Sequence, residues 1–149
     1  MLRYLAVGVI AVLPVLTPEP VAAQAGKAYR ARLSPVPVDL PMLPTIAGSG
    51  SVTAALTGNR LTINGSFEGL KSPATLLKIH RGIRGVRGPA VLDLMAPPSA
   101  TSGQISATVD LSPSQVDDLA KERLYLQLYS EKAPEGNLWG WLLPQENKR

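Results

Sequence analysis

His80 is the only histidine in this chain of 149 residues, and the chain contains no cysteine. Imidazole is the side chain best suited to proton transfer near neutral pH and to binding a transition metal. Alternation along a strand would place Lys78 on the same face as His80, but a lysine cation has no lone pair to give a metal. Compensating carboxylates would be needed, and the spacing does not place any of them beside His80. The candidates are Glu68, Asp93 and Glu131.

We therefore predict that the chain holds no metal and no cofactor, and that His80 hydrogen-bonds a neighbouring strand or loop, with Tyr129 as a candidate partner. Nucleophilic catalysis also lacks a signature, because there is no cysteine, no Gly-x-Ser-x-Gly elbow and no second histidine. Asp117 and Asp118 lie on an expected exposed helix and should be solvated. We predict that the protein is not an enzyme. A divergent metal-binding protein or enzyme with a site around His80 is the alternative.

Three arginines recur at every third position, at Arg81, Arg84 and Arg87, with glycines between them. The glycines allow tight turns, so we expect a loop. Its guanidinium groups could gather into a positive patch that binds phosphate, sulfate or carboxylate groups. In the alternative, the loop is solvated and its arginines point in different directions.

Four aromatic residues near the C-terminus, Tyr125, Tyr129, Trp139 and Trp141, alternate with apolar residues on two expected strands. If the leucines face the core, all four rings share the outward face of the sheet. Exposed aromatic patches mark contact surfaces for proteins or glycans. On this interpretation, replacing either tryptophan by alanine should cost little stability. In the alternative, the segment 35–44 or the helix covers the rings and makes a second small core.

The elements that must position these side chains are mostly strands. Two runs, Gly50–Leu56 and Arg60–Phe67, flank Gly58-Asn59 and predict a hairpin, while Gly65 suggests a bulge or a close backbone approach. Ser112-Pro113-Ser114-Gln115 predicts a capped helix. The segment 35–44 holds four prolines and predicts an extended loop packed by its apolar side chains, or a ligand-recognition polyproline helix. The remaining strand candidates are Tyr29–Leu33, Ala74–His80, Pro89–Met95, Gln104–Asp110, Arg123–Tyr129 and Leu138–Leu143.

The first 23 residues have the pattern of a secretory signal peptide, with Arg3, an apolar run from Leu5 to Leu16, and a cleavage site after Ala23. The run is too short and too broken by Pro14 to favour a membrane anchor. Arg3 and Glu19 are the only charges removed with it, so the mature chain keeps the net charge of +4. That surplus is too small for a nucleic-acid binder. We expect residues 24–149 to form one domain, secreted or periplasmic, with no membrane span.

Three segments together resemble the CHRD domain family. They are Arg30-Ala31-Arg32-Leu33-Ser34, the run Leu76–Gly82 with Gly85 and Gly88 behind it, and the run Pro134–Leu142. They correspond to the family's "A-x-L-S", "AHIH-G" and "P-x-G-E-I-R-G-Q-L" patterns, and the resemblance spans about Tyr29 to Leu143. It implies a secreted β module. Where the family often has two further histidines, this chain has Lys78 and Tyr129, and the two tryptophans stand where the family has Arg and Gln.

Together these observations predict an all-β protein: an antiparallel β-sandwich or flattened barrel of about eight strands with one short helix. We expect an exported, non-catalytic module that binds a protein or glycan partner, or an anionic ligand, through the aromatic face, the arginine loop or both. A structural envelope or matrix protein that self-associates is a further alternative.

Overall fold

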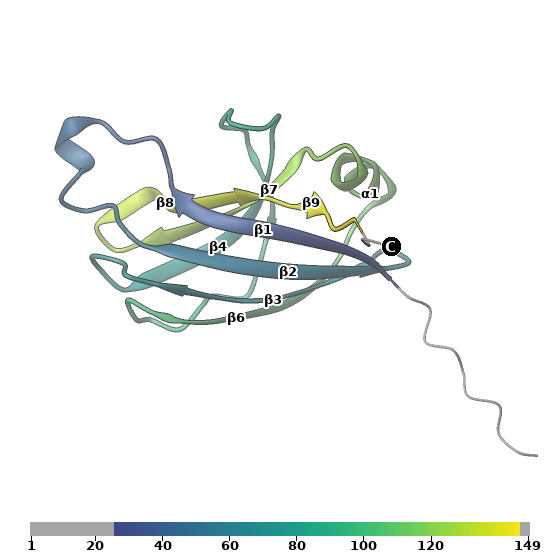
Figure 1. The fold of residues 1–149 in the computed structure, drawn as a ribbon, viewed down its shortest axis with the longest axis horizontal. Coiled ribbons are helices and arrows are strands. Elements are labelled where there is room, and N and C mark those ends of the chain that lie inside the picture. Colours follow the sequence, from purple (N-terminus) through teal and green to yellow (C-terminus); the bar gives the residue numbers. More distant parts are fainter. Residues whose placement is uncertain (1–25, 147–149) are drawn as a thin grey trace, which may run out of the picture.

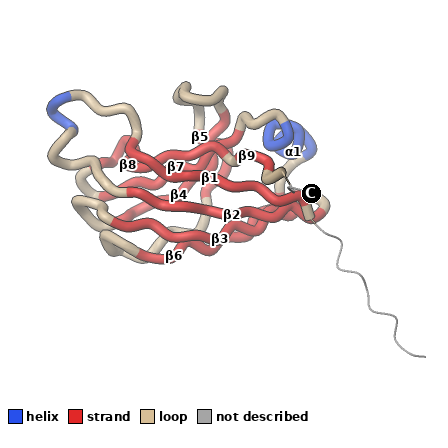
Figure 2. Tube along the Cα trace, viewed as in Figure 1, coloured by secondary structure: helices blue, strands red, loops and turns tan. Residues whose placement is uncertain are grey.

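The computed structural model describes residues 26–146, which form nine strands, one α-helix and one 3-10 helix (Figures 1 and 2). The elements in chain order are β1 (Lys27–Pro35), η1 (Leu40–Met42), β2 (Ser49–Thr57), β3 (Arg60–Glu68), β4 (Ala74–Arg81), β5 (Ala90–Asp93), β6 (Gly103–Asp110), α1 (Pro113–Ala120), β7 (Leu124–Ser130), β8 (Ala133–Trp141) and β9 (Leu143–Pro144). The signal peptide expected at residues 1–23 lies outside the described residues. Within 26–146, no helix has the length and apolar character needed to cross a membrane.

The strands form one antiparallel sheet in the order β5-β4-β7-β8-β1-β2-β3-β6, with β9 beside β1. The sheet curls into a half-barrel (Figure 1). Strand β1 joins its two halves, because residues 27–33 pair with β2 while Ser34 and Pro35 pair with β8. The predicted all-β antiparallel class is confirmed, and of the two architectures expected, the single curled sheet is closer to the flattened barrel.

The predicted hairpin is β2–β3, and its turn uses Gly58 at φ 63°. Gly65 makes no bulge, since β3 pairs residue for residue with β2 on one side and β6 on the other. It marks a close approach instead: a Cβ at this position would lie 2.2 Å from the carbonyl oxygen of Ser51. Gly65 faces inward, and its missing side chain lets the sheet bend tightly around the core.

The inner face of the half-barrel encloses the main hydrophobic core. Each of the long strands contributes alternate apolar side chains to it, such as Leu33, Ile63, Ile79, Leu126 and Leu138, all fully buried. Leu119 closes the core from α1. With no disulfide available, this burial is the main source of stability.

The helix α1 begins as the sequence predicts. The Ser112 hydroxyl accepts a hydrogen bond from the backbone N–H of Gln115, and the Gln115 side chain accepts one from the Ser112 N–H, which completes a capping box. The expectation that Asp118 is solvated is wrong. Its side chain is buried, and one of its carboxylate oxygens forms an ion pair with Nε of Arg81 at 2.9 Å. This contact ties the helix to the end of β4.

Replacing Gly65 by alanine should destabilise the protein by about 1–3 kcal/mol, because the new methyl group would push the backbone of β2 away from β3. Urea unfolding followed by circular dichroism measures the change. Thr62→Ala is the matched control, since Thr62 is an exposed residue on the same strand and its truncation should change stability by no more than about 0.5 kcal/mol. Equal midpoints for the Gly65 variant and the wild type would show that the close approach is easily relaxed.

Candidate functional site

His80 lies on β4 with both ring nitrogens hydrogen-bonded. Nδ1 is 2.8 Å from the carbonyl oxygen of Gly88, and Nε2 is 2.7 Å from the hydroxyl of Tyr129. A carbonyl can only accept, so Nδ1 carries a proton and donates it, and in the singly protonated ring Nε2 accepts a hydrogen bond from the hydroxyl of Tyr129. Burial raises the pKa of Tyr129, although nearby Lys78 opposes that shift, so the hydroxyl keeps its proton at neutral pH. The expected hydrogen bond between His80 and Tyr129 is confirmed.

These contacts decide what His80 can do chemically. To bind His80, a metal ion would need a free lone pair on one of the ring nitrogens. Both nitrogens are engaged in short hydrogen bonds with groups of the protein. Lys78, which shares the face, pairs with Asp93 at 3.1 Å, so that carboxylate is also engaged. Within residues 26–146, His, Asp and Glu side chains form no cluster of three or more that could hold a metal ion. The imidazole is a structural bridge between β4, β7 and the loop that ends at Gly88.

His80 belongs to a cluster of five packed rings, which we call the aromatic cluster: His80, Tyr125, Tyr129, Trp139 and Trp141. The Tyr125 ring lies at its centre, with centroids 5.0 Å from His80, 4.5 Å from Trp141 and 5.7 Å from Trp139. The two tryptophan rings meet edge to face at 4.8 Å. The expectation that the four aromatic residues share one face of the sheet is therefore met, because β7 and β8 pair directly with Tyr125 opposite Trp141.

The expectation that this face is open to solvent is wrong. Trp139 and Trp141 are each only 8% exposed, and Tyr125 is fully buried. Val36 and Ile46, from the segment that follows β1, complete a second hydrophobic core with these rings. This is the alternative in which the proline-rich segment covers the aromatic residues. Consequently, every residue of β7 is buried, on both faces of the strand.

The aromatic cluster also holds the arginine-bearing loop, residues 82–88, by its two ends. Trp141 donates its indole N–H to the carbonyl oxygen of Gly82 at 2.9 Å. The Tyr125 hydroxyl accepts from the N–H of Gly88 at 2.9 Å and lies 3.2 Å from its carbonyl oxygen. The two ends approach so closely that a Cβ on Gly88 would lie 1.7 Å from the carbonyl oxygen of Arg81. The expected architectural role of the loop glycines is confirmed, with Gly85 at the tip adopting φ 83°.

The three arginines of this region contact three different partners and do not form one free patch. Arg81 binds the buried Asp118, and Arg84 pairs with the exposed Glu122 at 3.2 Å. Arg87 donates to backbone carbonyl oxygens of Pro37 and Glu135, each at 3.4 Å. The structure agrees with the alternative in which the arginines point in different directions, because each guanidinium group contacts an acceptor of a different element.

A shallow groove of about 320 Å³ joins the loop to the aromatic cluster. Its charged lining residues are Arg32 on β1 and Arg84 on the loop, and Trp139 and Trp141 also line it. Among the described residues, no carboxylate pairs with Arg32. No sequence pattern marked Arg32 as a binding residue, although its outward position follows from the alternation of β1.

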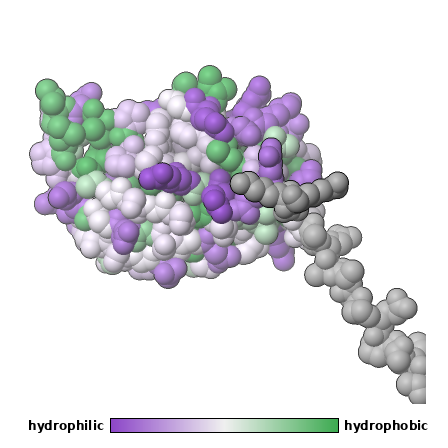
Figure 3. Space-filling view, in the orientation of Figure 1, coloured by the Kyte–Doolittle hydropathy of each residue, from purple (hydrophilic) through white to green (hydrophobic). Residues whose placement is uncertain are grey.

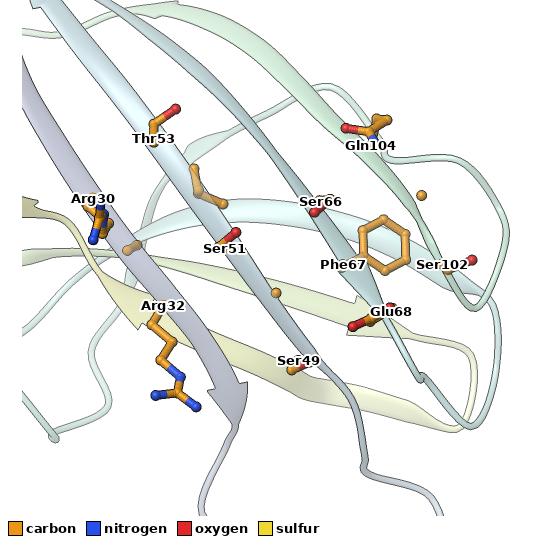
Figure 4. A pocket seen from close by; sticks show the side chains of 14 residues that line it. Arg30, Arg32, Ser49, Ser51, Thr53, Ser66, Phe67, Glu68, Ser102 and Gln104 are labelled. Carbon is orange, nitrogen blue, oxygen red and sulfur yellow. The ribbon is translucent and has the colours of Figure 1, made fainter.

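Arg32 also borders a wider trough of about 890 Å³ on the outer face of β1, β2, β3 and β6. Short polar side chains line it, including Ser51, Thr53 and Ser66, and Arg30 lies beside Arg32 along its edge (Figure 4). Arg32, Ser51, Ser66 and Gln104 stand opposite one another on the four neighbouring strands. Arg32 therefore lies at the boundary between a hydroxyl-rich surface and the tryptophan groove.

Trp139→Ala and Trp141→Ala should each lower the free energy of unfolding by about 3–5 kcal/mol, because each removes a buried ring from the second core. This replaces the sequence-based expectation of a small effect. Urea unfolding measures it, with near-ultraviolet circular dichroism reporting on the remaining aromatic cluster. Leu76→Ala, at an exposed apolar position on β4, is the control that should stay close to wild type. Wild-type midpoints for both tryptophan variants would mean that the rings contribute nothing to the core.

Chelators and added zinc or copper should leave the melting temperature unchanged, because neither nitrogen of His80 offers a lone pair to a metal. Thermal unfolding of the purified protein with EDTA, and with calcium-saturated EDTA as the control, measures this. A fall of many degrees with EDTA alone would show that a metal holds the structure together.

The family model of the CHRD domain matches residues 29–142, which covers most of the chain and agrees with the span expected from its motifs. No curated protein and no solved structure matches the chain. The matched region includes the strands of both cores, the aromatic cluster and the arginine-bearing loop. At this level the match supports a non-enzymatic module of the binding type, and the chain belongs to the CHRD domain family.

Proposed function

We propose that this protein is an exported, non-catalytic binding module that takes an anionic group of its partner in the groove between Arg32 and Arg84. One observation carries the proposal: two arginines from distant parts of the chain, Arg32 and Arg84, line one hollow together with Trp139 and Trp141. Guanidinium groups bind carboxylate, sulfate and phosphate oxygens through paired N–H donors. The ligand is therefore a group of that chemistry.

The two arginines are available to a ligand in different degrees. Arg32 is exposed and has no carboxylate partner among the described residues. Arg84 is paired with Glu122, and both side chains are about half exposed or more. An ion pair of that kind contributes ~0–1 kcal/mol, so a well-placed anion can displace it. The groove thus offers the positive charge of Arg32 directly, and that of Arg84 when the anion displaces Glu122.

The tryptophans act in this proposal as a rigid floor. Each ring is fixed by its neighbours in the aromatic cluster, and Trp141 is fixed further by its hydrogen bond to Gly82. A ligand that settles in the groove meets ring edges that cannot move away, so little conformational entropy is lost on binding. The aromatic face therefore contributes to binding through its edge and not through an open surface.

A catalytic role has less support than binding. His80 is 7% exposed and is enclosed by its hydrogen-bond partners, so it cannot reach a substrate in the groove without breaking them. Asp118 is buried and paired with Arg81, so its carboxylate is not available to a substrate either. The signal-peptide pattern of residues 1–23 supports export.

The double change Arg32→Ser with Arg84→Ser should weaken binding to a polyanion about tenfold or more, since the loss of even one charge-assisted hydrogen bond exceeds the ~1.4 kcal/mol that corresponds to tenfold. The mature chain would be applied to a heparin column and eluted with salt, and the variant should elute at lower salt than wild type. Its unfolding midpoint should be unchanged.

The matched control is the double change Lys27→Ser with Arg60→Ser, which removes the same net charge at the opposite end of β1 and β3. It should elute close to wild type. Equal elution of the two double variants would show that heparin senses only the net charge, and would remove the groove as the binding site.

A further inference from the structure

Among residues 26–146, two loops display most of the large apolar side chains that are exposed. Leu40 and Leu43, in and after η1, are 83% and 54% exposed, and Ile83 and Val86, in the loop 82–88, are 61% and 50% exposed. In Figure 3 the two loops appear as separate hydrophobic patches at the top of the view, one over the segment around η1 and one over the loop after β4. Exposed aliphatic groups on two neighbouring loop tips indicate a contact surface.

The two loops are linked to each other and to the groove. Arg87 extends from the loop 82–88 and donates to the carbonyl oxygen of Pro37, which precedes η1. Arg87, Met42 and Ile46 line one small cavity of about 260 Å³ between the two segments. Arg84 and Gly85, beside Ile83 and Val86, line the groove. The tip that carries Ile83 and Val86 therefore borders the proposed anion site, and Arg87 links the segment around η1 to the same loop.

Both loops are fixed at their bases, so the exposure of their tips is built into the fold. The segment around η1 is anchored by the buried Val36 and Ile46, whereas η1 itself has no buried residue. The other loop is anchored by Gly82 and Gly88, which the aromatic cluster holds. A collapse of the tips onto the body would require these anchors to break.

We propose that these two tips insert into an anionic lipid bilayer while Arg32 and Arg84 bind the phosphate of a lipid headgroup. The inference rests on the proposed anion-binding function and assigns its partner. A surface on which aliphatic side chains project beside guanidinium groups matches the interface of a bilayer, where apolar groups enter the acyl boundary and cations meet the phosphates. The carboxylates of the same region are Asp39, Glu122 and Glu135; Glu122 pairs with Arg84, and the other two oppose binding.

Vesicle co-sedimentation tests the proposal with the mature chain. The probes are vesicles of phosphatidylcholine alone and vesicles with about one-third phosphatidylglycerol. The wild type should bind the anionic vesicles more tightly, and added salt should weaken that binding. Leu40→Ser with Leu43→Ser, and separately Ile83→Ser with Val86→Ser, should each reduce binding to anionic vesicles by about tenfold or more, because binding scales with the apolar area that inserts.

The matched control is Leu76→Ser with Met95→Ser, which removes two exposed apolar side chains that lie outside the two loops. It should bind vesicles as the wild type does. Heparin retention of every loop variant should be unchanged, because no groove arginine has been altered. A vesicle defect without a heparin defect would therefore support the bilayer as the partner.

A second measurement reports insertion directly. Because the chain contains no cysteine, Leu43→Cys can carry a single environment-sensitive fluorophore, with Thr62→Cys on the outer sheet face as the control. Anionic vesicles should shift the emission of the Leu43 label to the blue and leave the emission of the Thr62 label unchanged.

The proposal is overturned if the wild type is retained on heparin but does not bind the vesicles, or if the loop variants bind vesicles as well as the wild type does. It is also overturned if the wild type self-associates in size-exclusion chromatography and the leucine changes abolish that association, since the tips would then contact a second copy. Unchanged heparin retention of the double variant Arg32→Ser with Arg84→Ser would instead contradict the anion-binding function itself.

Discussion

The hydrogen bonds that converge on Gly88 determine how the outer face of β7 and β8 is built. His80 donates to its carbonyl oxygen, and the Tyr125 hydroxyl contacts both its N–H and its carbonyl oxygen. Because a side chain on Gly88 would collide with the backbone of Arg81, only glycine permits this approach. The loop 82–88 is therefore closed at its base by buried groups, and its tip must project from the sheet. Without this junction, Arg84 would have no fixed position relative to Arg32.

The same junction explains why β7 is buried on both faces. Leu124, Leu126 and Leu128 fill the core of the half-barrel, while Tyr125 packs in the second core with Val36 and Ile46, and Tyr129 bonds to His80. Gln127, between the two tyrosines, is buried as well and donates to the carbonyl oxygen of Glu135, as a polar side chain on a covered face requires. The aromatic residues of β7 and β8 supply both the packing and the hydrogen-bond donors that a covered outer face requires, since Tyr and Trp carry a polar group at one end of a large ring.

Local features of the sequence predicted local structure well. The capping box of α1, the β2–β3 hairpin and the close approach at Gly65 each depend on residues near one another in the chain or on the absence of a side chain. The hydrogen bond between His80 and Tyr129 could be anticipated because alternation fixes which side chains share a face.

Alternation along a strand does not predict which segment covers that face. The burial of Trp139 and Trp141 depends on a segment about one hundred residues away in the chain. The pairing of Arg81 with Asp118 and the position of Arg32 beside Arg84 likewise arise from tertiary contacts that no short motif encodes.

The arrangement of the second core has a consequence for how binding and stability are related. The rings that line the groove are also the rings that anchor the loop, so any substitution that removes them changes stability and the binding surface together. The charged and aliphatic groups at the periphery are different, because Arg32, Leu40 and Leu43 are exposed and contribute little to the cores. In such a fold, partner preference can vary through peripheral residues while the buried aromatic residues keep the geometry constant. This separation follows from rigidity. The loop 82–88 is closed at Gly88, and the segment around η1 is anchored by Val36 and Ile46. Little conformational entropy is therefore lost when their tips bind a partner.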